Sequence, residues 1–367
     1  MDRRSALRAC CRSALLFASG PALAQQAPRV VFLNPGEPVE RGTGPFWRMV
    51  SQFMADAAKI FGMQLEVLYA ERDHLLMQRQ AEEVASRADS PHYIVIVNEK
   101  GAAQQMLETF RQSPAKLFLI HNDLTAEQRR AIGNERDRVP NWIGTATTDE
   151  ARGSYQLMEH LYRQLGGREA RVIGITGDRN TPVSLERAQG VENYIAHARH
   201  GRIEQLAHGN WSYADGEQKA SVLLSRYPDA SIIWAANDSM ALGAVRAVKA
   251  RGASVLVGGM GGWGDALASI AQGGLAATAA GHYLIGAWAI VMLHDYHRGH
   301  DFAAHGGPNQ KLDYLYVVNR NNVTRYEQAF FQRRDTLNFR IYSKTLHPRP
   351  GRYDFSLAHL VAKGKGR

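Results

Sequence analysis

Short apolar runs alternate with longer helical stretches along most of this 367-residue chain. The spacing of the longer stretches predicts amphipathic helices, as in Phe46–Gly62, where Phe46, Val50, Phe53 and Ala57 fall on one face. Alternating strands and helices predict parallel sheets with right-handed crossovers, which is a doubly wound α/β fold. The runs predicted as strands are Arg29–Asn34, Gln64–Tyr69, Tyr93–Asn98, Lys116–His121, Arg171–Thr176, Ile203–His208, Ser231–Asn237 and Ser254–Gly258.

The pattern of strands and helices starts a second time. One set of units runs from about Arg29 to Trp142, and another runs from about Arg171 to Gly274. Two sets predict two sheets with a crevice between them, and the chain is long enough for two domains. Ligands of open α/β sheets lie beyond the carboxyl ends of the strands. The residues that follow each strand are therefore the first candidates for a site.

The first 24 residues have the features of a secretory signal. Four arginines precede an apolar run, Ala14–Ala24, which ends in small residues and is too short to span a bilayer. We therefore expect export to the periplasm, with cleavage after Ala24. Cleavage removes both cysteines, Cys10 and Cys11, together with four arginines and Asp2, so the net charge falls from +9 to +6. That charge is too modest to indicate a nucleic-acid partner.

Two further patterns have a functional and a structural interpretation. Gly259–Gly264 has the letters of a dinucleotide-binding loop after a strand. No acidic residue ends a strand about twenty positions later, so a flexible loop near the crevice is favoured over a nucleotide site. His294, His297, His300 and His305 have the spacing of metal ligands, but histidines near a helix C-terminus also complement its dipole.

We predict no metal, no cofactor and no catalytic residue. The chain contains no nucleophile elbow, no zinc-protease helix and no phosphate-binding loop. An enzyme therefore has no positive support in the sequence.

Aromatic and polar residues follow several predicted strands. Aromatic rings cover the C–H faces of a sugar, while amide and guanidinium groups pair with neighbouring hydroxyls. This combination predicts a small, polar, ring-shaped ligand. The residues are Phe46, Trp47, Trp211, Asn122, Arg187, Asn237 and Asp238.

From about Arg29 to Asn319 the chain resembles the ribose/galactose type of periplasmic solute-binding proteins. Gly44–Trp47 resembles that family's Asn-Pro-Phe-Phe element, and Leu185–Gly190 resembles its Arg-x-x-Gly helix start. The segment Ala235–Gly243 matches the family's most distinctive stretch almost letter for letter, and Leu275–Thr278 resembles the strand that returns to the first lobe. There is also some likeness to the autoinducer-2 receptor.

The resemblance implies two doubly wound lobes joined by a three-segment hinge. The first lobe would comprise residues 25–145 and 280–310, and the second would comprise residues 146–279 and 311–324. The chain would cross between the lobes near Thr145–Asp149, Ala279–His282 and Val318–Asn322. Residues 325–367 extend beyond the usual end of the family, either as a surface wrap or as a docking surface for a membrane partner.

The resemblance also implies a ligand site. Phe46 and Trp47 would stack on the ligand from the first lobe and Trp211 from the second, while Asn122, Arg187 and Asn237 would bind hydroxyls. Asp149, near the first hinge crossing, is a further candidate.

The chain departs from the family at two positions of this implied site. Gly261 stands where the family usually has an aspartate, and Gly281-His282 where it has a glutamine or asparagine. Trp263 and His282 lie at or beside these positions and complete the predicted set. An unpaired buried hydroxyl costs about 1–3 kcal/mol. The ligand should therefore differ from ribose and galactose.

The implied function is a monomeric receptor that captures the ligand by lobe closure and delivers it to the membrane permease of an ABC-type importer. The alternative is a receptor that passes its closed state to a sensor kinase or chemoreceptor. A DNA-binding repressor with the same lobes is disfavoured, because a helix-turn-helix domain would have to precede the first strand at Arg29.

Overall fold

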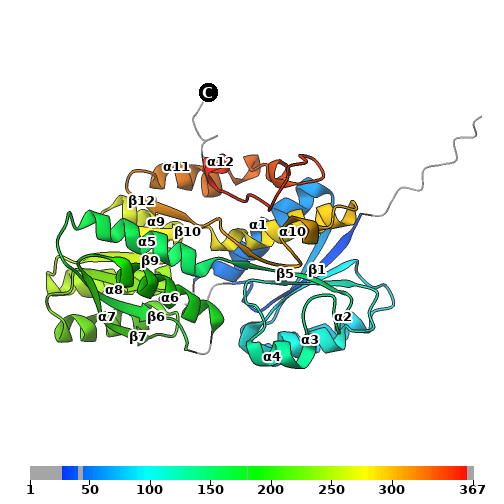
Figure 1. The fold of residues 1–367 in the computed structure, drawn as a ribbon, viewed down its shortest axis with the longest axis horizontal. Coiled ribbons are helices and arrows are strands. Elements are labelled where there is room, and N and C mark those ends of the chain that lie inside the picture. The colour runs from blue at the N-terminus through cyan, green and yellow to red at the C-terminus, as the bar shows by residue number, and fades with distance from the viewer. Residues whose placement is uncertain (1–26, 40–43, 180, 362–367) are drawn as a thin grey trace, which may run out of the picture.

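The computed structural model describes residues 27–39, 44–179 and 181–361, and these residues form two lobes, each built on a six-stranded sheet (Figure 1). The predicted signal peptide and the basic C-terminal residues 363–367 lie outside the described residues. The predicted two-lobe α/β fold is confirmed.

The first sheet is parallel throughout, in the order β11-β5-β4-β3-β1-β2. Successive side chains of a strand point to opposite faces, so Val30 and Phe32 pack with α1, while Val31 and Leu33 pack with α2 and α3. The strands are β1 (Arg29–Asn34), β2 (Gln64–Tyr69), β3 (Tyr93–Val97), β4 (Lys116–Ile120), β5 (Trp142–Thr148) and β11 (Asn309–Leu312). The helices are α1 (Phe46–Phe61) and α10 (Ile285–His297) on one side and α2 (His74–Ala85), α3 (Ala103–Thr109) and α4 (Ala126–Ile132) on the other.

The second sheet has the order β12-β10-β9-β8-β6-β7, with only β12 antiparallel to its neighbour among the described strands. Its helices α7 and α8 approach closely because Gly243 has no side chain; a Cβ there would lie 2.2 Å from the Tyr213 carbonyl oxygen. The strands are β6 (Ala170–Thr176), β7 (Gly201–His208), β8 (Ile232–Ala235), β9 (Leu256–Gly261), β10 (Ala277–Ala280) and β12 (Tyr316–Asn319). The helices are α5 (Glu150–Gln164), α6 (Pro182–His197), α7 (Tyr213–Arg226), α8 (Asp238–Arg251) and α9 (Gly264–Ala271).

Three segments connect the lobes. The chain crosses from β5 to α5, from β10 towards α10, and from β11 to β12 at Asp313–Leu315. The expected third crossing at Val318–Asn322 was wrong, because Tyr316–Asn319 already pairs with β10 in the second sheet. The Tyr314 hydroxyl joins all three crossings: it lies 2.8 Å from Thr148 Oγ1 and donates to the His282 carbonyl oxygen at 3.1 Å.

Residues 323–361, which we call the C-terminal strap, run across both lobes on the hinge side (Figure 1). The first helix of the strap, α11 (Val323–Glu327), packs on α9 and β12 of the second lobe. The Tyr326 hydroxyl then reaches that of Tyr283 in the first lobe at 2.7 Å. Further on, the buried ring of Phe355 stacks on Trp288 of α10, with centroids 4.6 Å apart. The strap therefore lies over the surface of both lobes, which corresponds to the surface wrap of the sequence analysis. Its aromatic side chains, however, are buried in the core.

Helix α10 is enclosed by the rest of the protein, and every residue from Ile285 to Asp295 is buried. It has 13 residues. Across residues 27–39, 44–179 and 181–361, no helix is long and apolar enough to cross a membrane.

Candidate functional site: a cleft between the lobes

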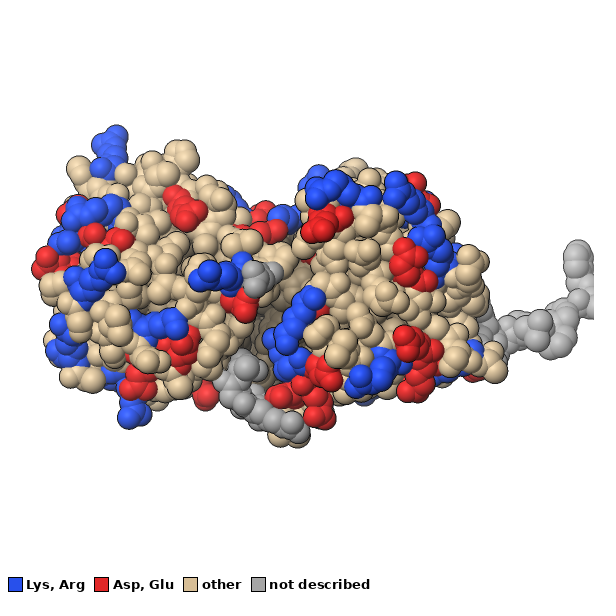
Figure 2. Space-filling model, turned by 90° about the horizontal axis from the view of Figure 1, so that it is seen from below, with Lys and Arg blue, Asp and Glu red and all other residues tan. Residues whose placement is uncertain are grey.

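A cavity of about 740 Å³, including the open space at its mouth, lies between the two lobes. Figure 2 shows the hollow from the side opposite the strap. Its walls come from the carboxyl ends of strands in both sheets, where side chains of separate strands converge. The lining residues are Gly44, Phe46, Trp47, Arg72, Glu99, His121, Asn122, Thr181, Val183, Arg187, Trp211, Asn237, Met260, Gly261, Trp263 and His282.

The first lobe contributes a cluster of three rings. Helix α1 begins directly after Pro45, which places Phe46 and Trp47 in its first turn at the cleft. Their ring centroids are 4.8 Å apart, and His121, just after β4, lies 5.0 Å from Phe46 and 5.1 Å from Trp47. Gly36 makes room for this cluster, because a Cβ there would lie 2.1 Å from the Trp47 Cβ. The rings are inclined to one another by 43° to 86°, and together they give the cleft an aromatic wall.

The second lobe contributes Trp211 and Trp263. Trp211 has a left-handed backbone, with φ of 71°, and its carbonyl oxygen accepts from the Asn237 side-chain amide at 2.8 Å. Gly177 leaves space for the indole, since a Cβ there would lie 1.9 Å from it. Trp263 is 6% exposed and faces the cleft from the turn between β9 and α9. Rings from both lobes therefore border one cavity.

Glu150 is the centre of a buried cluster at the base of the cleft. The Arg187 Nε donates to Glu150 Oε2 at 2.7 Å, and another Arg187 nitrogen, Nη1, donates to the Ala236 carbonyl oxygen at 2.6 Å. His282 Nε2 lies 3.0 Å from the same carboxylate oxygen. Glu150 and His282 stand on two hinge crossings, so this cluster joins the hinge to the ligand cavity.

Burial and charge determine the ionisation of this cluster. Burial alone would raise the pKa of Glu150, but the charge of Arg187 and, once the ring is protonated in acid, the charge of His282 hold that pKa below its usual range. Burial lowers the pKa of His282, and it lowers the pKa of His121 to about 3. At neutral pH the cleft therefore contains an ionised Glu150–Arg187 pair and neutral His121 and His282 side chains, which can donate or accept hydrogen bonds.

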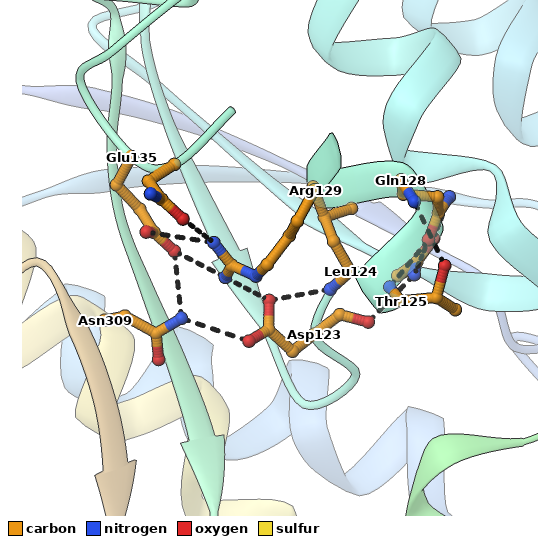
Figure 3. Close-up of polar contacts among 9 residues, drawn as sticks. Asp123, Leu124, Thr125, Gln128, Arg129, Glu135 and Asn309 are labelled. Atoms are coloured by element: carbon orange, nitrogen blue, oxygen red, sulfur yellow. Dashed lines mark hydrogen bonds and ion pairs between the residues drawn. The ribbon is translucent and has the colours of Figure 1, made fainter. Parts of the chain in front are cut away.

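Asn122 is 3% exposed, and its Oδ1 has no hydrogen-bond partner in the protein. The residue that follows it, Asp123, is held by a network of polar contacts, which Figure 3 shows. Arg129 of α4 contacts Asp123 at 2.6 Å and Glu135 at 2.9 Å, and Asn309 of β11 donates to both carboxylates at 3.0 and 3.1 Å. The polar edge of the cleft is therefore supported by a network of side chains outside it.

Sequence reasoning did not single out Arg72, Glu99 or His121. Arg72 and Glu99 follow β2 and β3 and form an ion pair of 3.1 Å on the cleft wall. All three follow the carboxyl ends of strands, where ligands of such sheets bind, but none of them belongs to a recognisable sequence motif. Glu150 was also missed, whereas its neighbour Asp149 was predicted. Asp149 caps α5 by accepting from the Arg152 amide at 3.0 Å and is not among the residues that line the cavity.

Asn237 and Asp238, from the family-like segment, have structural partners. The Asn237 Oδ1 caps α8 by accepting from the Met240 amide at 2.9 Å. Asp238 is fully buried and accepts from the Gly262 amide at 2.6 Å and the Thr278 hydroxyl at 2.7 Å. The segment Gly259–Gly264 lies at the cleft, as predicted, but only part of it is a loop: Gly259–Gly261 belong to β9, Gly264 begins α9, and Asp238 fixes the turn between them.

The histidines near the end of α10 have protein partners. His294 lies 3.1 Å from Asp295 through Nδ1, and His297 lies 3.1 Å from the Tyr93 hydroxyl. Within the described part of the chain, no group of three or more histidine, cysteine, aspartate or glutamate side chains is arranged to hold a metal ion.

Two α/β lobes, a three-segment hinge and an inter-lobe cavity define the class of cleft-binding receptors that close around a ligand. A family model described as periplasmic binding protein domain matches residues 39–301. The chain belongs to this family.

Individual relatives support the assignment. A periplasmic sugar-binding protein from Pseudomonas fluorescens superposes with a TM-score of 0.78 at 33% identity, over 91% of this chain and 99% of that one. The ribose import binding protein of Haemophilus influenzae is 29% identical over 58% of this chain and 76% of the relative. The D-apiose import binding protein of Actinobacillus succinogenes is 25% identical over 57% and 73%.

Proposed function

We propose that this protein is the periplasmic receptor of an ABC-type importer and captures a sugar or sugar-like molecule between its lobes. The observation that carries the proposal is the cavity bordered by rings from both lobes, with Asn122, Arg187 and His282 between them. Aromatic faces and hydrogen-bonding groups at one cleft match the two sides of a sugar ring. The alternative of a sensor-coupled receptor uses the same fold, and the named relatives favour import.

In such a receptor, closure of the two lobes around the ligand is the change that a partner protein recognises. A ligand shifts the balance between open and closed forms only if it binds them with different affinity. A molecule held by Phe46 and Trp47 on one lobe and by Trp211 on the other makes its full set of contacts only when the lobes are together. We infer that the closed, monomeric form is the state that a membrane permease recognises, and that residues 1–24 direct export.

A ligand screen tests this function. We expect at least one pentose, hexose or polyol to raise the melting temperature of residues 25–367, because binding to the folded state stabilises it by mass action. Calorimetry on that ligand should then give a dissociation constant at least about tenfold weaker for Asn122→Ala, which removes a buried hydrogen-bonding group.

The choice of variants follows from the structure. Asn321→Ala, an exposed substitution of the same kind outside the cleft, should leave the affinity unchanged. Arg187→Ala and Asn237→Ala are poorer probes, since they also remove an ion pair and a helix cap. A panel in which no carbohydrate shifts the melting temperature would refute the proposed function.

A further inference from the structure

The turn between β9 and α9 presents carbon atoms to the cleft. Its Gly262 amide, which would otherwise be a donor for a ligand, is bound to the buried carboxylate of Asp238 at 2.6 Å. Gly261 brings no side chain, and the Met260 sulfur accepts a hydrogen bond from the Ser154 hydroxyl at 3.0 Å. Apart from the indole N–H of Trp263, this part of the wall therefore has little left with which to bind a hydroxyl group.

The Trp263 indole occupies the space beside this turn. A Cβ at Gly261 would lie 2.2 Å from the ring, and a Cβ at Gly44 of the opposite lobe would lie 3.2 Å from it. The ring thus lies between its own strand and the first lobe. We call the wall formed by Met260, Gly261 and Trp263 the apolar edge. Its backbone packs closely on β10, since a Cβ at Gly262 would lie 2.2 Å from the Ala280 Cβ.

Other polar groups of the second lobe are largely engaged. The Asn237 side chain binds the Met240 amide and the Trp211 carbonyl oxygen, and Arg187 binds Glu150 and the Ala236 carbonyl oxygen. By contrast, the first lobe and the hinge have buried side-chain atoms with no hydrogen-bond partner in the protein. These atoms are Asn122 Oδ1, His121 Nδ1 and His282 Nδ1.

We infer that the ligand has two unlike edges: hydroxyl groups toward His121, Asn122 and His282, and a methyl or methylene group toward the apolar edge. In chemical terms it is a deoxy sugar. A hydroxyl pressed against the apolar edge loses water without gaining a protein partner, whereas a methyl group gains burial. This inference rests on the proposed function and specifies the substrate class of the same site.

Matched sugar pairs test the inference on residues 25–367 by titration calorimetry. The pairs are L-rhamnose with L-mannose, L-fucose with L-galactose, D-fucose with D-galactose, and 2-deoxy-D-ribose with D-ribose. We expect the deoxy member of at least one pair to bind about tenfold tighter or more than its hydroxylated partner. Hydroxylated members that bind as tightly in every pair would overturn the inference and leave the proposed function intact. If no sugar binds, the proposed function fails and the inference fails with it.

Substitution of Trp263 tests the location of the apolar edge. Trp263→Phe keeps an aromatic ring and should preserve the preference for the deoxy sugar, even if both affinities fall. Trp263→Gln places an amide at the edge and should reduce the ratio of the two affinities at least about threefold. The ratio is the readout because a general loss of binding leaves it unchanged. An unaltered ratio in Trp263→Gln would overturn the assignment of this edge, and the comparison of sugar pairs on the unsubstituted chain does not depend on either variant.

Discussion

At the scale of single residues, a charged side chain that lines the cleft also neutralises a buried charge of the protein. Arg187 stands on the cleft wall, yet it also neutralises Glu150, a fully buried carboxylate 37 positions away in the chain. Sequence reasoning identified Arg187 and not Glu150. An acidic residue in the first turn of a helix usually complements the helix dipole at the surface. Only the fold shows that this one points inward.

Asp238 gives a pH prediction. Burial raises the pKa of Asp238 to about 6, above the ordinary value of 3.8, so between these values the folded state holds a proton that the unfolded state has released. The contribution of this group to stability is therefore fully present below pH 3.8 and is lost as pH rises through 6, by about 3 kcal/mol at most.

Asp238→Asn should remove this pH dependence while weakening the turn before α9, since Gly262 and Thr278 donate to different carboxylate oxygens and asparagine keeps only one of these acceptors. Urea unfolding of both proteins at pH 4, 5, 6 and 7 measures the difference, and the advantage of the unsubstituted protein should shrink as pH rises. Asp265→Asn, at an exposed position in the first turn of α9, is the matched control. Parallel stability curves for Asp238→Asn and the unsubstituted protein would contradict the prediction.

At the scale of elements, the alternation of apolar runs and helical stretches was enough to predict most strands and the fold class. The strands β5, β11 and β12 were not predicted. The sequence of β5, Trp142–Thr148, contains three threonines and a glycine, and β11 and β12 have four residues each. Their strand character comes from pairing with neighbours that are distant in the chain, which local pattern does not report.

The residues of the candidate site were likewise predicted only in part. Residues in family-like segments, such as Trp47 and Asn237, were predicted with the cleft position that the structure gives them. Arg72, Glu99 and His121 lie in segments without a motif and were missed. The partners of Asn237 and Asp238 depend on contacts between elements, so the sequence could place these side chains at the cleft but could not show that they also fix a helix cap and a turn.

The β4–α4 loop gives an element-scale prediction. Arg129→Met leaves the Glu135 side chain, which is 3% exposed, without its cationic partner, and removal of one partner of a buried pair costs about 3–5 kcal/mol. Urea unfolding should show this loss. Calorimetry should also show weaker ligand binding, because Asp123, the neighbour of Asn122 in the chain, loses its ion pair with Arg129 (Figure 3).

Arg130→Met, one position along the same helix but exposed, provides the control and should change the free energy of unfolding by less than about 0.5 kcal/mol. Arg129→Met/Glu135→Gln should recover part of the loss, since the unpaired charge is removed. Equal stability of the Arg129→Met and Arg130→Met variants would show that the network contributes no stability.

At the scale of the whole molecule, the lobes are held together by more than the three hinge crossings. Tyr314 connects the crossings to one another, and Tyr326 of the strap connects the second lobe to Tyr283 of the first. On the surface, Lys311 of β11 and Glu186 of α6 form an ion pair of 2.8 Å between the lobes. Because that pair is exposed, it contributes about 0–1 kcal/mol, and the buried aromatic contacts of the strap should dominate.

The strap therefore belongs to the cooperative core, and Phe355→Ala tests this. Phe355 is 2% exposed and stacks on the fully buried Trp288, so its truncation should cost about 3–5 kcal/mol of the free energy of unfolding. Leu346→Ala, at a strap position that is 45% exposed, should cost far less. Both values come from urea unfolding followed by tryptophan fluorescence and circular dichroism. If the strap were only an outer layer, Phe355→Ala would unfold with the midpoint of the unsubstituted protein or show a small early transition. A single transition shifted as a whole is the result expected of a segment that is anchored on both lobes.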